Sequence, residues 1–276
     1  MSVFQRIQNI DRRIIYTLVF VFLLFPMFRP LGLPLNITRE TQASFDAIDE
    51  LPAGSLMLFV TAIGPGNEAE LLPQSIAVIK HMISLGHKIV FVPLAAVSPA
   101  YTARYAELCA GEGLVAGVDY LDLPFLAGGE TVYAAIGSNF QSLYENEPAS
   151  PLLGSIADVT DFAMVIDCGA GESQRWAIAH IEEPKGVPIV ALITAVILAV
   201  TQPYFSSGQV QGLVSGLNGA AEYEFLAKVP GKAAAGMDAQ SLGHLLIILF
   251  VILGNVGYFA GRRPGRSAGG NQGGAA

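Results

Sequence analysis

The chain has 276 residues, of which 52% are hydrophobic and 14% are charged. This composition is too apolar for an ordinary water-soluble domain and too polar for a chain that lies wholly in a membrane. The charges are segregated, with a net +3 before Thr38, −14 from Thr38 to Ser241 and +3 after Ser241. An acidic middle between two basic ends argues against nucleic-acid binding, which needs a basic face.

The first predicted element is a transmembrane helix over residues 14–35. It follows Arg12 and Arg13, and its only charge is Arg29, whose long side chain can reach the membrane surface. Its length suits the roughly 20 residues that a spanning helix needs. A cleaved signal peptide is the alternative, but no small-residue cleavage site follows the apolar run. We interpret the segment as an uncleaved signal anchor, with residues 1–13 in the cytoplasm.

Residues 38–235 have the pattern of one α/β domain. A short amphipathic helix is expected over Thr38–Leu51, and apolar runs then alternate with helical segments. The predicted strands are Leu56–Ile63, Lys88–Leu94, Val118–Phe125 and Phe162–Cys168, and the helices between them include Glu68–Leu85, Pro99–Cys109 and Glu172–Ile181. Such alternation predicts a parallel sheet covered on both faces, in a flavodoxin-like or Rossmann-like three-layer fold.

The segment Gly186–Phe205 has two interpretations. It is uncharged and long enough to cross a bilayer, but Val187–Thr194 is also rich in β-branched residues and falls where a fifth strand is due. Three spans would place Arg262, Arg263 and Arg266 outside the cytoplasm, whereas two spans place them inside. We therefore favour the strand.

The C-terminal part is predicted to return to the membrane. Ser206–Leu226 has the spacing of a closely packed helix, residues 242–260 form a second transmembrane helix, and residues 261–276 form a flexible cytoplasmic tail. This gives a plasma (inner) membrane protein with two spans, both termini in the cytoplasm and the α/β domain outside it. Small residues in the last span allow close packing on the first span or on another membrane subunit; they are Gly243, Gly254 and Gly257.

A ligand site is expected beyond the carboxyl ends of the strands, where open parallel sheets bind their ligands. Three glycine-rich loops there each lead to an acidic residue. The candidate residues are Gly64, Gly66, Asn67, Glu68, Gly128, Gly129, Glu130, Asp167, Gly169, Gly171 and Glu172. A glutamate at a helix start repels a phosphate or dinucleotide, so a cation, an amine or a hydroxyl-rich ligand fits better. The structural alternative is that these glutamates only stabilise their own helix dipoles.

Side chains suited to catalysis or metal binding are sparse. His81, His87 and His180 form no metal-binding motif, and we expect all three at the surface. Cys109 and Cys168 lack zinc-site spacing and are expected to be small buried apolar residues, with a disulfide as the alternative in an oxidising compartment. No metal or cofactor is expected. An enzyme is left open but disfavoured, since no GxSxG motif occurs.

Several strings in the chain form a familiar set. They are Pro65-Gly66 with Glu70-Leu71 and Pro73-Gln74, Gly186-Val187-Pro188 with Thr194-Ala195-Val196, Gly208-Gln209 with Gly212-Leu213, the run from Gly216 to Glu224, and the run from Gly236 to Ser241. With this set the chain resembles uncharacterised prokaryotic membrane-anchored α/β proteins that have an anchor at each end. The resemblance implies this layout but no activity or ligand. The alternation is also similar to a flavodoxin-like domain or one lobe of a periplasmic binding protein, which says little about function.

These features lead to three functional hypotheses. The first is a membrane-anchored extracytoplasmic module with a ligand-binding, sensory or assembly role and no catalysis. The second is a membrane-anchored hydrolase or transferase that uses the acidic rim at the strand ends. The third is a structural subunit of a membrane complex. The lipid bilayer is the one partner common to all three.

Overall fold

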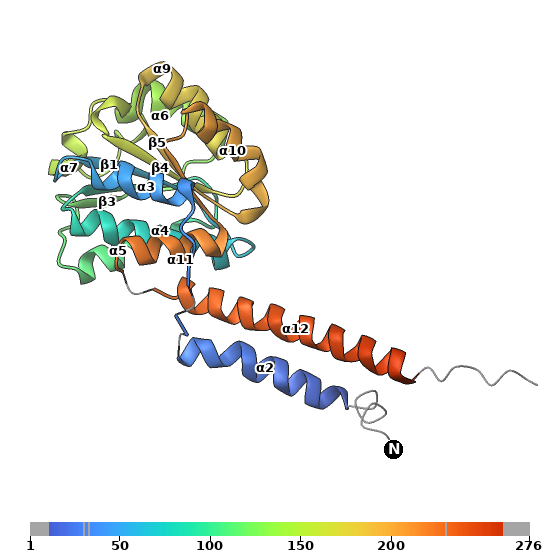
Figure 1. Cartoon of the computed structure of the whole chain (residues 1–276). Helices are drawn as coiled ribbons and strands as arrows, with labels where there is room; N and C mark the ends of the chain where they lie inside the picture. The colour runs from blue at the N-terminus through green and yellow to red at the C-terminus, as the bar shows by residue number, and fades with distance from the viewer. Residues whose placement is uncertain (1–10, 30, 33, 230, 262–276) are drawn as a thin grey trace, which may run out of the picture. The chain divides into compact units, whose positions relative to one another are not determined.

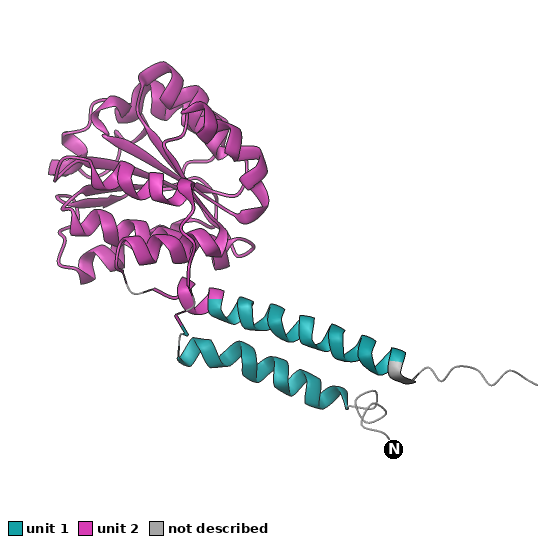
Figure 2. Ribbon diagram, viewed as in Figure 1, with its two compact units in different colours: residues 1–31, 238–276 teal, residues 32–237 magenta. Residues whose placement is uncertain are grey.

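The structure is a computed structural model that describes residues 11–29, 31–32, 34–229 and 231–261. The chain divides into two compact units (Figure 2). The α/β unit comprises Gly32–Met237, and the helical unit comprises Met1–Leu31 with Asp238–Ala276. The predicted cytoplasmic ends, 1–13 and 261–276, lie almost entirely outside the described residues.

The α/β unit is built on a six-stranded, wholly parallel sheet, which confirms the α/β architecture. Its strands are β1 (Leu56–Ala62), β2 (Lys88–Pro93), β3 (Tyr120–Asp122), β4 (Met164–Gly169), β5 (Ile189–Ile193) and β6 (Gly212–Ser215). Their order is β3-β2-β1-β4-β5-β6. This order matches one common type of doubly wound sheet and differs from the flavodoxin order. Successive strands are added toward one edge from β1 to β3 and toward the other edge from β4 to β6, so the order switches between β1 and β4.

Helices cover both faces of the sheet (Figure 1). One face carries α3 (Arg39–Asp49), α4 (Glu68–Ser84), α5 (Pro99–Gly111) and α11 (Gly216–Leu226). The other carries α6 (Glu130–Leu143), α7 (Pro151–Gly154), α8 (Ser173–Ala177) and α10 (Leu198–Ser207), with the short turns η1 (Val159–Asp161), η2 (Ile178–Glu182), α9 (Glu183–Lys185) and η3 (Ala195–Ile197). Successive strand residues alternate between the two faces, so each strand contributes to two separate cores.

The segment Gly186–Phe205 contains β5, η3 and the start of α10, and the third-span interpretation is therefore wrong. Strand β5 pairs with β4 on one side and with β6 on the other, and all five of its residues are buried. Gly186 ends the preceding helix in the left-handed conformation, with φ of 70°. The apolar residues of β5 can therefore lie inside the sheet, because β4 and β6 satisfy the hydrogen-bonding groups of its backbone.

The prediction of one helix over Ser206–Leu226 is wrong, because the structure forms β6 there before α11 begins at Gly216. Val210, Leu213 and Val214 have spacing that also fits a helix, which misled the sequence interpretation. Strand β6 adds to the edge of the sheet beside β5 and lies against α3. A Cβ on Gly212 would overlap Ser44 of α3, so this close approach needs a glycine.

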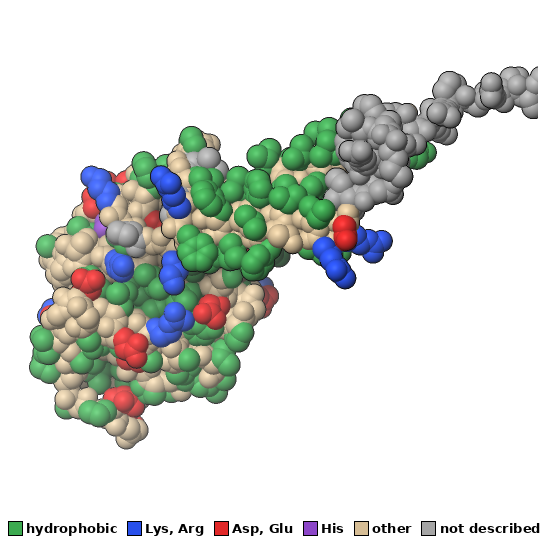
Figure 3. All heavy atoms as spheres, turned by 90° about the horizontal axis from the view of Figure 1, so that it is seen from below, with side chains coloured by type: hydrophobic (Ala, Val, Ile, Leu, Met, Phe, Trp, Pro, Cys, Tyr) green, Lys and Arg blue, Asp and Glu red, His purple; other side chains and the backbone are tan. Residues whose placement is uncertain are grey.

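The helical unit contains α2 (Arg12–Phe28) and α12 (Ala233–Gly261) from Asp238 onward. Within the described residues, one helix, Ala233–Phe259, is long and apolar enough to cross a membrane, judged by length and composition. Only 11% of its most apolar stretch is buried. It begins well before the predicted start at residue 242. Helix α2 has 17 residues, fewer than the predicted span of 14–35. Many hydrophobic side chains are visible on the face of these helices that Figure 3 shows.

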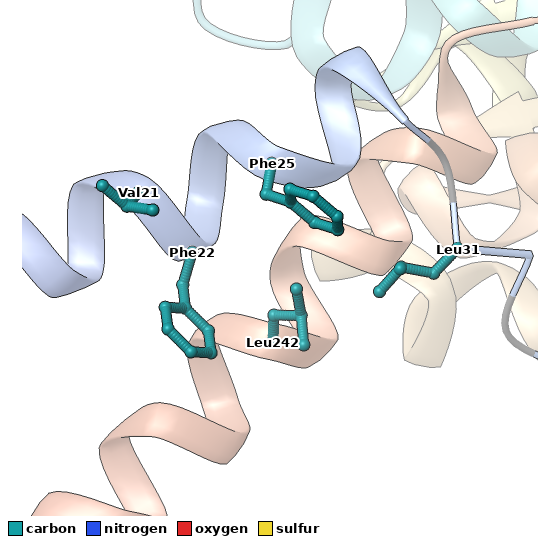
Figure 4. A pocket seen from close by; sticks show the side chains of 5 residues that line it. All are labelled: Val21, Phe22, Phe25, Leu31 and Leu242. Atoms are coloured by element: carbon teal, nitrogen blue, oxygen red, sulfur yellow. The ribbon is translucent and has the colours of Figure 1, made fainter.

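Helices α2 and α12 pack on each other within the helical unit. A Cβ on Gly243 would lie 3.1 Å from Cδ2 of Leu23, whereas Gly254 has open space and Gly257 is buried. A wholly apolar pocket of about 380 Å³ opens between the helices (Figure 4), lined by Val21, Phe22, Phe25, Leu31 and Leu242. Gly243 therefore lies where α12 packs closely on α2, which agrees with the predicted alternative in which the last span packs on the first.

Candidate functional site

The carboxyl edge of the sheet brings the predicted loops together. Ala62 of β1 pairs with Gly169 of β4, so the loops that follow these two strands start side by side at the point where the strand order reverses. Gly129 lies next to the Trp176 ring, and a Cβ there would be 3.5 Å from it. This places the start of α6 beside α8. Gly129 also has φ of 52°, a conformation that favours glycine.

The first loop is closed by contacts of its own. Asn67 Oδ1 accepts a hydrogen bond from the Gly64 amide at 2.8 Å. Glu68 accepts one from the Tyr101 hydroxyl at 3.0 Å and one from Arg104 at 3.3 Å. Glu68 thus ties α4 to α5, and its carboxylate has partners without any ligand.

The other rim glutamates are also paired locally. Glu130 Oε1 lies 3.1 Å from Nε2 of His180, and Glu172 Oε2 lies 3.2 Å from a terminal nitrogen of Arg175. Exposed pairs of this kind contribute about 0–1 kcal/mol each. Among the described residues, no three His, Cys, Asp or Glu side chains are grouped as metal ligands would be. The rim carboxylates do not converge on one point.

Asp167 lies beneath the rim, because it is an inward residue of β4 and is fully buried. The Tyr133 hydroxyl donates a hydrogen bond to its Oδ1, and the Ser173 hydroxyl donates one to its Oδ2 at 3.0 Å. Burial raises the pKa of Asp167 to about 6, although its hydrogen bonds act in the opposite direction. Asp167 joins α6 and α8 to the sheet and is too deep to meet a ligand at the rim.

The glycines of the other two loops differ in what surrounds them. A Cβ on Gly169 would lie 2.5 Å from Oγ of Ser173, and one on Gly128 would lie 2.5 Å from Oγ1 of Thr131, so a larger residue at either position would displace a hydroxyl. Gly66 and Gly171 have nothing within 4 Å of a Cβ position. The backbone of these last two is therefore open to an approaching molecule.

A cavity of about 320 Å³ lies at this edge between α8 and α10. It is lined by Gly171, Glu172, Gln174, Arg175, Ile197, Val200, Thr201 and Tyr204. Two of these residues, Gly171 and Glu172, were predicted, and the rest were missed. The signal was present in the sequence: a strand was expected at Val187–Thr194, and the segment after it supplies half of the lining.

Gln174 and Thr201 are the buried polar residues of this cavity, with 2% and 3% of their surfaces exposed. Gln174 is the one with an unpartnered atom among the described residues. Its Nε2 donates to the carbonyl oxygen of Gly169 at 3.3 Å. Its Oε1 is buried and has no hydrogen-bond partner among the described residues. A buried acceptor without a partner is unusual in a folded protein and marks a place where a donor is missing.

The histidine prediction is wrong for two of the three residues. His81 and His87 are 4% and 1% exposed, because α3 covers the end of α4, a contact that the sequence does not reveal. Burial lowers the pKa of both imidazoles. His81 lies 2.9 Å from the Tyr223 hydroxyl and stacks on the Phe45 ring. His180 is half-buried, with 29% of its side chain exposed.

The two cysteines are free and buried, as expected for small apolar residues. Burial raises the pKa of both Cys109 and Cys168 to about 12. The Sγ of Cys168 lies 3.3 Å from the Ser75 hydroxyl. A thiol with so high a pKa stays protonated at neutral pH, which is unfavourable for a nucleophile.

Two buried glutamates on α11 hold the ends of the α/β unit. Glu222 is fully buried and accepts from the Thr38 amide at 3.0 Å and from its hydroxyl at 2.6 Å. Glu224 accepts from the amides of Ala233 and Ala234 at 3.1 and 3.2 Å, which caps the start of α12. One helix thus fixes both chain segments that lead out of the unit, a role that the sequence did not indicate.

No protein-family model matches the chain, and no curated protein matches it in sequence. One solved structure that is similar to it, that of MT0777, has 9% sequence identity and a TM-score of 0.35. The match covers 63% of this chain and 96% of that one. A likeness of this size carries no argument about function.

Proposed function

We propose that this chain is a membrane-anchored α/β module that binds a small ligand at the carboxyl edge of its sheet and does not act on it. The observation that carries the proposal is the cavity between α8 and α10. One residue of its lining, Gln174, has a buried Oε1 atom without a partner among the described residues. Doubly wound sheets bind ligands at this edge, and a concave site with a few polar groups is the usual form of a small-molecule pocket.

A thermal-shift screen tests the ligand-binding part. The full chain in detergent micelles is heated with divalent metals, amines, sugars or amino acids, each in excess. A ligand that binds only the folded state raises the melting temperature, by mass action. One stabilising class is expected. If no class moves the melting temperature, the α/β unit is not a receptor for these small ligands.

The anchoring part of the proposal assigns two spans. Helix α12 is supported by its length and apolar surface, and α2 by exposed apolar side chains with no charge between Arg13 and Arg29. Both termini then lie in the cytoplasm, and the α/β unit lies outside the plasma (inner) membrane. Reporters fused after Lys185, after Lys228 and at the C-terminus test this topology; a cytoplasmic signal after Lys228 would reverse it.

A second role, as a subunit of a membrane complex, is favoured by one observation. Nothing lies within 4 Å of a Cβ position on Gly254 of α12, so another helix could approach the α12 backbone closely there. Copurification in mild detergent tests this role, and replacing Gly254 with leucine should release the partner. A hydrolase or transferase that uses the acidic rim has less support, because the rim carboxylates do not converge on one point, and Glu68 and Glu130 pair with residues of other helices.

A further inference from the structure

The cavity between α8 and α10 presents opposite charges side by side. Glu172 and Arg175 line it and form an ion pair at 3.2 Å, with 62% and 58% of their side chains exposed. An exposed pair of this kind holds together weakly, so a ligand that carries both charges can exchange with it at little cost. The planar guanidinium of Arg175 suits a carboxylate, and the carboxylate of Glu172 suits an ammonium group.

One lining residue of the cavity, Gln174, has a buried acceptor without a partner among the described residues. The Nε2 of Gln174 is committed to the Gly169 carbonyl, which leaves its Oε1 as the free atom. An ammonium group has three N–H donors and no acceptor. It can therefore donate to Glu172 and to Gln174 together, which neither a hydroxyl nor a carboxylate can do.

The opposite wall of the cavity is mostly apolar, and its Thr201 hydroxyl already donates to the Ile197 carbonyl oxygen at 3.0 Å. Ile197, Val200 and the half-buried Tyr204 line it, and Val200 is 70% exposed. Exposed apolar side chains at the mouth of a cavity gain when a ligand covers them. A volume of about 320 Å³ is at the small end of ligand pockets, which span roughly 300–1,000 Å³. The ligand is therefore small and has one apolar arm.

We propose that this cavity binds the zwitterion of an α-amino acid with an apolar side chain. The carboxylate pairs with Arg175, the ammonium group donates to Glu172 and Gln174, and the side chain lies on Ile197, Val200 and Tyr204. The net charge of −14 over Thr38–Ser241 makes a plain anion a poor ligand. This inference rests on the proposed ligand-binding function and names its ligand class.

Calorimetric titration of the full chain in detergent micelles tests the ligand class. L-leucine and L-phenylalanine are compared with isoamylamine, which lacks the carboxylate, and with isocaproate, which lacks the ammonium group. At least one amino acid should bind at one site per chain, and each analogue should bind at least about tenfold more weakly, because each loses a charge-assisted hydrogen bond. Isoamylamine binding as tightly as the amino acid would refute the zwitterion.

Variants test the location. Arg175→Ala should raise the dissociation constant at least about tenfold. Arg104→Ala is the matched control, because Arg104 forms a similar exposed pair with Glu68, at 3.3 Å, away from the cavity; it should bind like the unmodified chain. Gln174→Leu should also weaken binding, and if it fails to fold, the exposed Arg175 still decides the test.

Besides tight binding of isoamylamine, two results would overturn the inference: no binding of either amino acid at millimolar concentration, or unchanged binding by Arg175→Ala. If another class of ligand stabilises the chain in the thermal-shift screen while both amino acids fail, the proposed function stands and only the ligand class is wrong. If no class binds, both are wrong.

Discussion

Removing the Glu222 carboxylate should destabilise the α/β unit strongly. Glu222 is fully buried and accepts from the amide and hydroxyl of Thr38 and from the side-chain amide of Asn218. Glu222→Ala removes this acceptor from half-buried Thr38 and exposed Asn218, so water can replace part of what is lost. A hydrogen bond contributes about 0.5–1.5 kcal/mol net, so losing three partly exposed ones should cost about 2 kcal/mol of unfolding free energy. Glu222→Gln keeps one acceptor oxygen and should lose less.

Urea unfolding of the full chain in detergent micelles measures this loss. Trp176, the only tryptophan in the chain, is half-buried against Tyr133 and reports on the α/β unit. Glu183→Ala is the control, because Glu183 is exposed and accepts one hydrogen bond from Gln209, at 2.9 Å. This control should change the unfolding free energy by no more than about 0.5 kcal/mol.

A double-mutant cycle separates the contact from its surroundings. Thr38→Val removes the hydroxyl that Glu222 accepts, and the coupling energy of the pair should fall within about 0.5–3 kcal/mol. If Glu222→Ala unfolds at the same urea concentration as Glu183→Ala, or if the coupling energy is zero, Glu222 does not hold the segment that leads to α3.

Three further predictions concern the interior of the α/β unit. Because burial raises the folded pKa of Asp167 to about 6, its protonated form favours folding. The stability that Asp167 contributes should be full below about pH 4 and fall by about 3 kcal/mol as the pH rises through about 6. Urea titrations across this range measure it as the part of the slope that Asp167→Asn removes. Gly137→Ala should lower the melting temperature markedly, since its Cβ would overlap the His180 carbonyl, whereas Gly154→Ala, with open space, should not. Cys168 should resist a maleimide in the folded chain and react once urea unfolds it, because it is buried and its pKa is about 12; fast labelling of the folded chain would contradict its burial.

The candidate site could be predicted in position but not in content. The sequence placed glycine-rich loops after the strands, and the sheet brings them to one edge. It could not show that Glu68 and Glu130 each meet a partner, because Arg104 and His180 come from other helices. Equally, no local pattern marks Gln174 as buried, since its surroundings come from folded neighbours.

The sequence by itself determined the alternation of apolar runs and helices and the identity of its most apolar helix, because burial on both faces and membrane burial each demand a characteristic run of apolar residues. The tertiary structure decided the pieces whose local pattern fits two states. The uncharged, apolar composition around β5 also suits a membrane span, and the spacing of apolar residues around β6 also suits a helix. Pairing along the sheet, and the close approach of α3 to Gly212, selected the strand in each case, because only there are the backbone groups satisfied and the side chains packed.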